Sequence, residues 1–364
     1  MAYCPSFINL VIYKYNKNRF NKKKLLIALN LILLISLSVN AQEKKKYALY
    51  SVAFYNLENL FDYTHDQGKD DYEYLPEGKN NWDSTKYVSK LKNMSEVLGM
   101  LARDKQPEGP AFIGLAEIEN RHVLEDLIKQ PALASTGYQF IHYEVPDQRG
   151  IDCALLYNPA LFNVKTSKLL PYVNPDDTVH KTRGFLVVNG VMADENVTVI
   201  VNHWPSRGAD SPARILAGKQ VRAIKDSLLR ENPALKIVIM GDMNDDPMDQ
   251  SMSKALGAHR EIADVEVGGL YNPWWNTLQV KGMGTLTYRG KWNLFDQIVV
   301  SSNLLGDDRS TLKFCKNEIF YRDFMIQQEG NYKGSPKRTF GGSVWLNGYS
   351  DHLPTIIYFL KEVK

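Results

Sequence analysis

Cysteine is scarce in this chain of 364 residues, which has three, at positions 4, 153 and 315. It contains no CxxC pair and no cluster of cysteine and histidine, so a structural zinc site is not expected. Cys153 and Cys315 are far apart in the sequence, and Cys153 lies in the apolar run "CALLY". A disulfide between them and a buried free thiol at Cys153 therefore both stay open.

Linkers and repeats are lacking as well. No proline- or serine-rich segment and no internal repeat divides the chain, and 44% of its residues are apolar, which is enough for a sizeable core. We predict one large domain over residues 47–362.

A membrane-spanning run is also missing, because the longest apolar stretch, residues 25–39, is shorter than the roughly 20 residues that a bilayer requires. This stretch follows Lys22–Lys24 and precedes the small residue Ala41. Basic residues, an apolar stretch and a small residue in this order are typical of a secretory signal peptide. We predict a signal peptide over residues 1–41, with the part before Asn21 as an N-terminal extension, and a periplasmic or secreted protein. An uncleaved membrane anchor is the alternative.

The net charge of +3 comes from this leader. Six of the 44 Lys and Arg, and none of the 41 Asp and Glu, lie in residues 1–41, so the rest of the chain has 38 basic and 41 acidic residues. Strong overall attraction to nucleic acid is thus not expected, and any binding of a phosphate has to come from a local group of residues.

Short segments rich in β-branched and aromatic residues recur along the chain and predict strands. Helical periodicity appears between some of them, over residues 84–103, 120–130 and 211–232. These helices are too few to alternate with every strand, so we predict a mixed α/β (α+β) arrangement with helices outside the sheets. The predicted strands are 48–56, 111–118, 138–143, 152–157, 184–192, 196–203, 236–242, 295–301 and 355–360.

Polar residues stand at the ends of several of these apolar strands. In a layered fold such strand ends open toward a cleft, so their shared placement predicts a functional site. The residues are Asn56, Glu117, His203, Asp242 and Asn244.

The segment "GDMNDDP" illustrates the pattern. Gly241 allows a turn, and Asp242 and Asn244 are two residues apart, so they can share a face. A turn rich in helix caps explains Asp245 and Asp246 well. It does not explain a carboxylate directly after an apolar strand, which makes Asp242 a functional candidate.

Two further segments show the same pattern. In "FYNLENLFD" the strand ends in Asn56 and Glu58, and in "GLAEIEN" it ends in Glu117. Mg²⁺ takes carboxylate and amide oxygens, often one or two protein carboxylates, with the remaining positions left to water and phosphate. One Asn and one Glu from adjacent strand ends fit that need. Glu119 and Asn120 we interpret as the start of the next helix.

Two histidines lie in similar places: His203 ends a strand in "VNHWPSR", and His352 follows Asp351 in "YSDHLP". A single histidine is more often structural than catalytic, but two of only seven occupy polar loops beside carboxylates here. Imidazole suits proton transfer near neutral pH, and a partner carboxylate fixes its tautomer. Asp152 and Asp296, each at the start of an apolar strand, are candidate partners.

In this order the motifs resemble those of the endonuclease/exonuclease/phosphatase superfamily, which includes DNase I-type nucleases, abasic-site endonucleases, neutral sphingomyelinases and inositol polyphosphate 5-phosphatases. The resemblance covers nearly all of residues 47–362 and runs through "YNLEN", "LAEIEN", "NHWPSR", "GDMND", "FDQI" and "SDHLP". It implies a DNase I-like four-layer α/β/β/α sandwich, in which two mixed sheets pack face to face with helices outside.

The resemblance also implies a metal site. Asn56 and Glu117 would hold a divalent cation, with Asp351 as a further ligand or a close neighbour of one. Mg²⁺ is the expected ion, and Mn²⁺ or Ca²⁺ are the alternatives.

Further roles concern the water and the phosphate. Asp242 would orient or deprotonate the attacking water, and Asn244 would hydrogen-bond the scissile phosphate, since phosphoryl chemistry depends on positioning and charge stabilisation. Arg149 and Arg207 could bind flanking phosphates as bidentate forks, although ordinary solvation of surface side chains explains them equally well.

The same resemblance gives the histidines a role. His352, held by Asp296, and His203, held by Asp152, would stabilise the transition state and protonate the leaving oxygen. No covalent enzyme intermediate is needed in this scheme.

The two-histidine pattern narrows the choice of substrate class. Abasic-site endonucleases usually carry Tyr at the position of His203, so the chain looks closer to DNase I types and sphingomyelinases. We predict a nuclease that cleaves DNA or RNA, and as the alternative a phosphodiesterase or phosphatase acting on phospholipid head groups or phosphorylated small molecules. Trp274 and Trp275 bear on this choice, because they could insert into a membrane, stack on bases or pack in the core. A non-catalytic binding module is not expected, since every catalytic position holds a competent residue.

Overall fold

The computed structural model describes residues 45–177, 179, 181–209 and 211–363, so the predicted signal peptide lies outside the described residues. The chain separates into two units, Met1–Lys46 and Tyr47–Lys364, and the fold below is that of the second. Among the described helices, none has the length and apolar character needed to cross a membrane.

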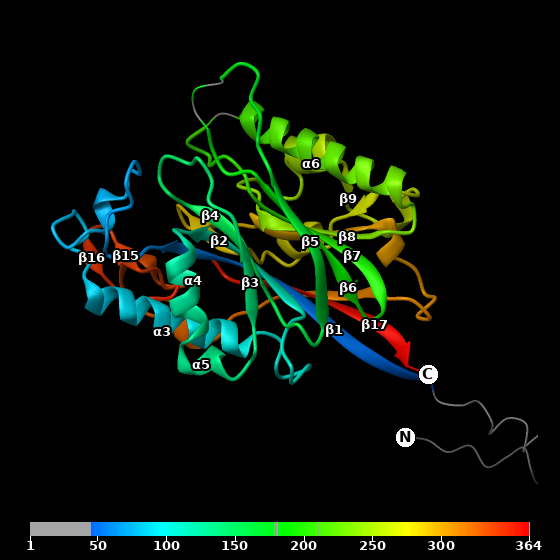
Figure 1. Ribbon diagram of the computed structural model, residues 1–364, viewed down its shortest axis with the longest axis horizontal. Helices are drawn as coiled ribbons and strands as arrows, with labels where there is room; N and C mark the ends of the chain where they lie inside the picture. The colour runs from blue at the N-terminus through cyan, green and yellow to red at the C-terminus, as the bar shows by residue number, and fades with distance from the viewer. Residues whose placement is uncertain (1–44, 178, 180, 210, 364) are drawn as a thin grey trace, which may run out of the picture. The chain divides into compact units, whose positions relative to one another are not determined.

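Two mixed β-sheets pack face to face at the centre of the fold (Figure 1). The first sheet contains, in spatial order, β14 (Lys313–Ile319), β17 (Thr355–Val363), β1 (Lys46–Leu60), β2 (Phe112–Ile118), β4 (Asp152–Tyr157) and β3 (Gln139–His142). The second contains β5 (Phe162–Leu170), β6 (Phe185–Met192), β7 (Glu195–His203), β8 (Lys236–Asp242), β13 (Asp296–Ser301), β10 (Leu270–Tyr271) and β9 (Ala258–His259).

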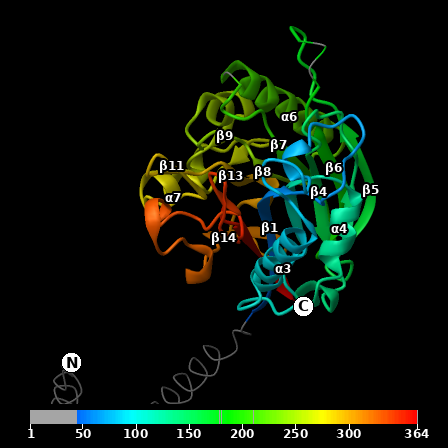
Figure 2. The ribbon, with the colours of Figure 1, turned by 90° about the vertical axis from the view of Figure 1, so that its left-hand side faces the viewer.

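Helices cover the outer faces of both sheets (Figures 1 and 2). On one side lie α3 (Ser84–Met100), α4 (Arg121–Ile128) and α5 (Pro131–Ala134), and on the other lies α6 (Ser211–Glu231). This arrangement confirms the predicted four-layer sandwich. The remaining elements are short: α7 (Trp275–Gln279), the hairpin of β11 (Leu286–Tyr288) and β12 (Lys291–Asn293), and the hairpin of β15 (Phe340–Gly341) and β16 (Val344–Trp345).

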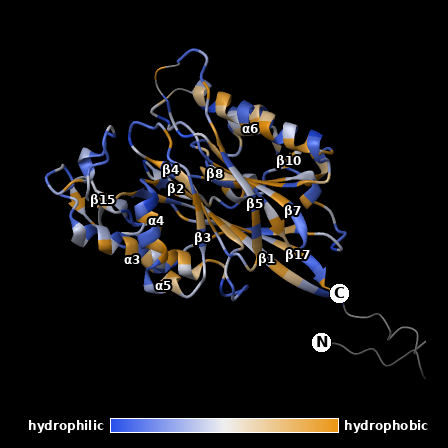
Figure 3. Cartoon of the chain, in the orientation of Figure 1, coloured by the Kyte–Doolittle hydropathy of each residue, from blue (hydrophilic) through white to orange (hydrophobic). Residues whose placement is uncertain are grey.

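The central strands are apolar throughout because both of their faces are covered. In β8, Ile237 and Ile239 pack with Ala217 and Val221 of α6, whereas Val238 belongs to the core between the sheets. Figure 3 shows this pattern as strands that are mostly hydrophobic and an α6 that alternates along its length.

Local signals fix where helices begin. Asp83 caps α3 by accepting a hydrogen bond from the backbone N–H of Lys86 at 2.9 Å. Asn120 caps α4 through the N–H of Val123 at 3.2 Å, which confirms its interpretation as a helix start. Glu119 has a different role, because it is buried and accepts a hydrogen bond from the N–H of Asp62 at 2.6 Å.

The cysteines and the tryptophan pair resolve two open choices. Cys153 is buried, Cys315 is exposed and both are free, so the disulfide alternative is wrong. Trp274 is fully buried and donates a hydrogen bond to the carbonyl of Ile298 at 2.9 Å, which confirms core packing for this residue. Trp275 is half-buried, and its indole N–H donates to Gln279 at 3.0 Å.

Gly241 lies inside β8 and does not make the turn that the sequence suggested. It is paired with Asn202 of β7 at so short a distance that a Cβ atom on Gly241 would lie 2.3 Å from the backbone oxygen of Asn202. A side chain here would push β7 and β8 apart directly before Asp242.

We expect Gly241→Ala to lower the free energy of unfolding by about 1–3 kcal/mol, the usual cost of overpacking a close-packed interior. Urea denaturation followed by tryptophan fluorescence measures this change. Gly208→Ala is the matched control, because its Cβ would meet nothing nearer than Ser206 Oγ at 3.4 Å. Equal midpoints for the two variants would contradict the close-approach argument.

Candidate active site

Three of the candidate residues lie in one row across the second sheet. In the strand register, Asp242 of β8 is paired with His203 of β7 on one side and with Asp296 of β13 on the other. Paired residues of neighbouring strands point to the same face of a sheet. Strand pairing therefore sets the spacing of these side chains.

Two β-bulges shape the contribution of the first sheet. The register of β1 with β2 shifts between Asn56 and Leu60, and that of β2 with β4 shifts between Ala116 and Ile118. Within these bulges Glu58 and Glu117 have positive φ angles of 49° and 61°, which are uncommon for residues other than glycine. Bulges are enriched next to active sites, where they redirect side chains.

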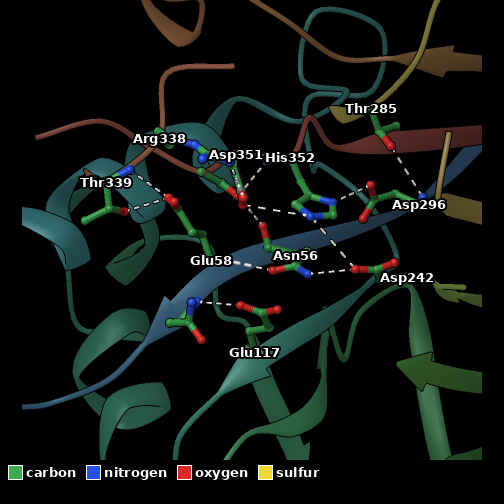
Figure 4. Close-up of polar contacts among 12 residues, drawn as sticks. Asn56, Glu58, Glu117, Asp242, Thr285, Asp296, Arg338, Thr339, Asp351 and His352 are labelled. Atoms are coloured by element: carbon green, nitrogen blue, oxygen red, sulfur yellow. Dashed lines mark hydrogen bonds and ion pairs between the residues drawn. The ribbon is translucent and has the colours of Figure 1, made fainter. Parts of the chain in front are cut away.

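A hydrogen bond joins the two sheets at the site (Figure 4): Asn56 Nδ2 donates to Asp242 Oδ2 at 3.0 Å. The other carboxylate oxygen of Asp242 accepts from the backbone N–H of Asn244 at 2.9 Å. Burial raises the pKa of Asp242 to about 7; Asp296 adds to the rise, whereas His352 opposes it. Asp242 is thus a rigidly held carboxylate that binds a proton near neutral pH.

His352 and Asp296 form a buried pair in which Nδ1 of the ring lies 2.7 Å from Oδ2 of the carboxylate. This is the pairing expected from the sequence. Burial disfavours the charged ring, but the carboxylates of Asp296, Asp351 and Asp242 outweigh it and raise the pKa of His352 well above its ordinary value. The neighbouring carboxylates therefore favour the protonated imidazole of His352.

His203 lacks the partner that the sequence suggested. Asp152 binds His142 instead, with Oδ2 at 2.7 Å from His142 Nε2, and its other oxygen accepts from the N–H of Val145 at 3.2 Å. His203 Nδ1 is buried and has no hydrogen-bond partner among the described residues. The prediction that Asp152 orients His203 is therefore wrong, because β3, which supplies His142, pairs with β4 next to Asp152.

The environment of His203 favours the neutral ring. Burial, together with the positive charges of Arg183 and Arg149, holds the pKa of His203 well below its ordinary value. Arg183 is itself buried, and it donates hydrogen bonds to Asp147 at 3.0 Å and to the carbonyl of Trp204 at 3.1 Å. His203 Nε2 lies 3.9 Å from Glu117 and 3.8 Å from Asp242. The surroundings of the two histidines thus favour different protonation states.

The two predicted phosphate-binding arginines are in different situations. Arg149 is exposed and donates a hydrogen bond to Asn59 at 2.6 Å, next to the bulge of β1. Arg207 contacts Asp246 at 3.3 Å and Asp249 at 3.1 Å. Its positive charge is balanced within the chain, which favours Arg149 as the arginine available to a ligand.

Sequence reasoning missed a buried network behind the site. Glu58 Oε2 accepts hydrogen bonds from the N–H and the hydroxyl of Thr339, each at 2.7 Å. Lys90 of α3 is buried, with its ammonium 2.7 Å from the Thr339 hydroxyl, 2.6 Å from the Tyr349 carbonyl and 3.7 Å from Glu58. Glu58 stood in the "YNLEN" motif, but no local pattern marks Lys90 among the other lysines of its helix.

These residues fit a hard divalent cation. Asn56, Glu117 and Asp351 offer only oxygen ligands, and Glu58 lies beside them. Burial and the neighbouring charge of Asp351 raise the pKa of Glu58 to about 7, even though Lys90 opposes the rise. Asp351 is bound by Arg338 at 2.7 Å. Carboxylates crowded in this way repel one another, and a divalent cation would offset that repulsion.

Comparison with known proteins agrees with the motifs. The sequence model of the endonuclease/exonuclease/phosphatase family matches residues 51–361. A search of curated proteins finds no match. Among solved structures the chain is similar to ANGEL2, a 2′,3′-cyclic phosphatase, with 15% identity, a TM-score of 0.55 and coverage of 89% of this chain and 100% of that one.

Two other solved structures are comparably similar. A mannosyl-6-phosphatase of Bacteroides thetaiotaomicron has 16% identity and a TM-score of 0.54, with 85% of this chain and 99% of that one covered. TDP2 of D. rerio, in complex with a single-strand DNA product, has 13% identity and a TM-score of 0.52, with 86% and 99% covered. At these identities the likeness shows the fold.

The buried ammonium of Lys90 yields a test of the network. We expect Lys90→Met to lower the free energy of unfolding by about 3–5 kcal/mol, because Glu58 would lose its neighbouring positive charge and the Tyr349 carbonyl its buried hydrogen-bond donor. Combining it with Glu58→Gln should cost less than the sum of the two single changes. Urea denaturation in EDTA measures all three variants, with Lys92→Met on the exposed side of α3 as control. Additive single changes would show that the two charges are not coupled.

Proposed function

Because the chain belongs to the endonuclease/exonuclease/phosphatase family, we propose that it is a divalent-metal-dependent phosphodiester hydrolase that cleaves nucleic acid. The observation that carries this proposal is the row of His203, Asp242 and Asp296, which strand pairing places side by side. His352 is hydrogen-bonded to Asp296 at one end of this row. It combines a fixed carboxylate with one charged and one neutral imidazole, which are the groups that hydrolysis of a phosphate ester by water requires.

Asn56, Glu117 and Asp351 are the proposed ligands of the cation, and Mg²⁺ is the proposed ion because all their donor atoms are oxygens. Mn²⁺ and Ca²⁺ are the alternatives. When bound, the ion would withdraw negative charge from the phosphate oxygens. Glu58 lies close enough to add to the negative field that attracts it.

Asp242 is the proposed base for the attacking water. Its two oxygens are held by Asn56 and by the backbone of Asn244, so the carboxylate does not need to reorganise as the proton moves. Burial raises its pKa to about 7, which brings its basicity close to the optimum for proton transfer at neutral pH. The side chain of Asn244 donates to the Trp204 carbonyl at 3.0 Å, and its remaining polar atoms are proposed to contact the phosphate.

The two histidines take different proposed roles. His352, kept charged by Asp296, stabilises negative charge on the phosphate and donates a proton to the leaving oxygen. His203, kept neutral by burial and by Arg183, acts as a hydrogen-bonding group beside Glu117 and Asp242. Arg149, exposed at the rim, is proposed to bind a flanking phosphate.

A nucleic-acid substrate accounts for these features better than a lipid does. Membrane insertion was one of three possible roles of Trp274 and Trp275, and Trp274 is buried in the core instead. One relative in fold, TDP2 of D. rerio, was solved with a single-strand DNA product, and another is described as a mannosyl-6-phosphatase. A phosphorylated small molecule is therefore the alternative that we keep.

We further propose that residues 1–41 are a signal peptide and that the protein acts in the periplasm or outside the cell. The order of basic, apolar and small residues supports this. A net charge of −3 outside the leader, from 38 basic and 41 acidic residues, suits a degradative enzyme that releases its product readily.

The role of His352 can be tested by turnover of residues 42–364 on plasmid DNA, RNA, sphingomyelin and bis-p-nitrophenyl phosphate. We expect Mg²⁺-dependent cleavage of nucleic acid that EDTA abolishes. His352→Ala should lower kcat by about 10²- to 10⁴-fold, the usual contribution of a general acid.

His122→Ala is the control, because the His122 side chain on α4 is 62% exposed. Its kcat should match that of the unchanged enzyme. Full activity of His352→Ala would refute the proposed acid, and cleavage of sphingomyelin alone would refute the nucleic-acid substrate.

Cleavage of the proposed signal peptide can be tested separately. Expressed from its natural start in a Gram-negative host, the protein should appear in the periplasm or medium with Gln42 as its first residue, as shown by mass spectrometry of its N-terminal peptide. A full-length chain retained in the membrane fraction would indicate an uncleaved anchor instead.

A further inference from the structure

A small pocket has Glu58 in its lining, beside the proposed metal ligand Asn56. It has a volume of about 160 Å³, and its lining includes Glu58, Tyr74, Lys79, Asn80, Thr339 and Phe340. Pockets for drug-sized ligands measure about 300–1,000 Å³. This one therefore has room for a single small ring. The backbone N–H of Glu58 donates to Asn56 Oδ1 at 2.9 Å, so the pocket lies close to the proposed metal ligands.

Glu58 determines what the pocket accepts. Its Oε2 is held by Thr339, whereas Oε1 receives no hydrogen bond from any described residue. A carboxylate oxygen is an acceptor that repels phosphate and attracts hydroxyl groups, which can donate to it. Lys90 contacts Thr339 from behind the carboxylate and so holds the group in place.

The walls of the pocket are aromatic and rigid. The ring of Tyr74 stacks on Phe61 at 4.3 Å between centroids, and that of Phe340 lies 6.0 Å from Trp82. The negative face of an aromatic ring attracts the weakly positive C–H groups of a sugar. Such walls favour a saturated ring over a charged or flexible chain.

Polar groups complete the pocket. Lys79 forms an ion pair with Glu73 at 3.1 Å, and Asn59 and Asn80 add amide groups to the lining. A fatty chain would cover Oε1 of Glu58 without offering it a hydrogen-bond donor, which is costly for a charged group. A second phosphate would meet the carboxylate of Glu58, while the charge of Lys79 is already paired with Glu73. A polyhydroxylated ring avoids both penalties.

We propose that this pocket binds a sugar ring that carries free hydroxyl groups and is attached to the phosphate undergoing hydrolysis. In a nucleic acid this ring is ribose with its 2′-hydroxyl, so the enzyme discriminates for RNA and against DNA. The inference rests on the proposed phosphodiesterase activity and names the substrate class of the same site.

The test compares kcat and KM of residues 42–364 with Mg²⁺ on four substrates. These are the dinucleotide UpU, its deoxyribose analogue dUpdU, a hexose 6-phosphate, and bis-p-nitrophenyl phosphate, which has no sugar. We expect kcat/KM for UpU to exceed that for dUpdU by about tenfold or more, the value of one hydrogen bond to a charged group.

Two variants test whether this pocket causes the preference for UpU over dUpdU. Phe340→Ala and Asn80→Leu should each raise KM for UpU by about fivefold or more while kcat changes less than about twofold, because they alter binding of the ring and not the reacting groups. Both should cleave bis-p-nitrophenyl phosphate as the unchanged enzyme does. That activity also shows that each variant is folded. If Phe340→Ala disturbs the β15–β16 hairpin, Asn80→Leu still tests the pocket.

The outcomes separate the two claims. No Mg²⁺-dependent cleavage of bis-p-nitrophenyl phosphate or of either dinucleotide would refute the proposed function itself. Cleavage of all three with equal kcat/KM for UpU and dUpdU, unchanged in both variants, would refute the sugar pocket alone. Preference for the hexose 6-phosphate, lost in both variants, would support the pocket and identify a free sugar phosphate as the source of the ring.

Discussion

The common register of β7, β8 and β13 is the constraint on which the site depends. It places His203, Asp242 and Asp296 side by side on one face of a buried sheet. The hydrogen bond from Asn56 to Asp242 then ties this row to the first sheet, where the irregular pairing of β1 and β2 leaves Glu117 beside His203. Because the row consists of paired strand residues, its geometry is as rigid as the sheet, and this rigidity is what catalysis by positioning demands.

Burial of charge explains most of the remaining features. Carboxylates that are fully or partly buried side by side repel one another and lose hydration, so each needs a compensating group. The positive charge of Lys90 offsets the negative charge of Glu58, Arg338 pairs with Asp351, and His352 pairs with Asp296. The same principle favours a protonated ring for His352, which faces carboxylates, and a neutral ring for His203, which is buried and lies near Arg183 and Arg149. A bound cation would complete this balance on the side where Asn56 and Glu117 converge.

Much of the fold and the site could be predicted from the sequence, because buried strands such as β2 and β8 are continuous apolar runs that end in polar residues. The edge strands β5 and β14 carry many half-exposed polar residues and gave no such signal. Ordered motifs identified the catalytic candidates. The contact of Asp152 with His142, and that of Lys90 with Thr339, join residues that sequence order does not relate. Such contacts follow from which strands are neighbours and which helix covers them, and therefore required the structure.

The central claim is that Asp242 acts on water and that no side chain attacks phosphorus. The stereochemistry of hydrolysis tests this most directly, using a phosphodiester of one known configuration made chiral by sulfur, cleaved in water enriched in ¹⁸O. A single in-line attack by water predicts inversion of configuration at phosphorus. Retention would require two successive displacements through a covalent intermediate on a side chain of the site, and would contradict the account.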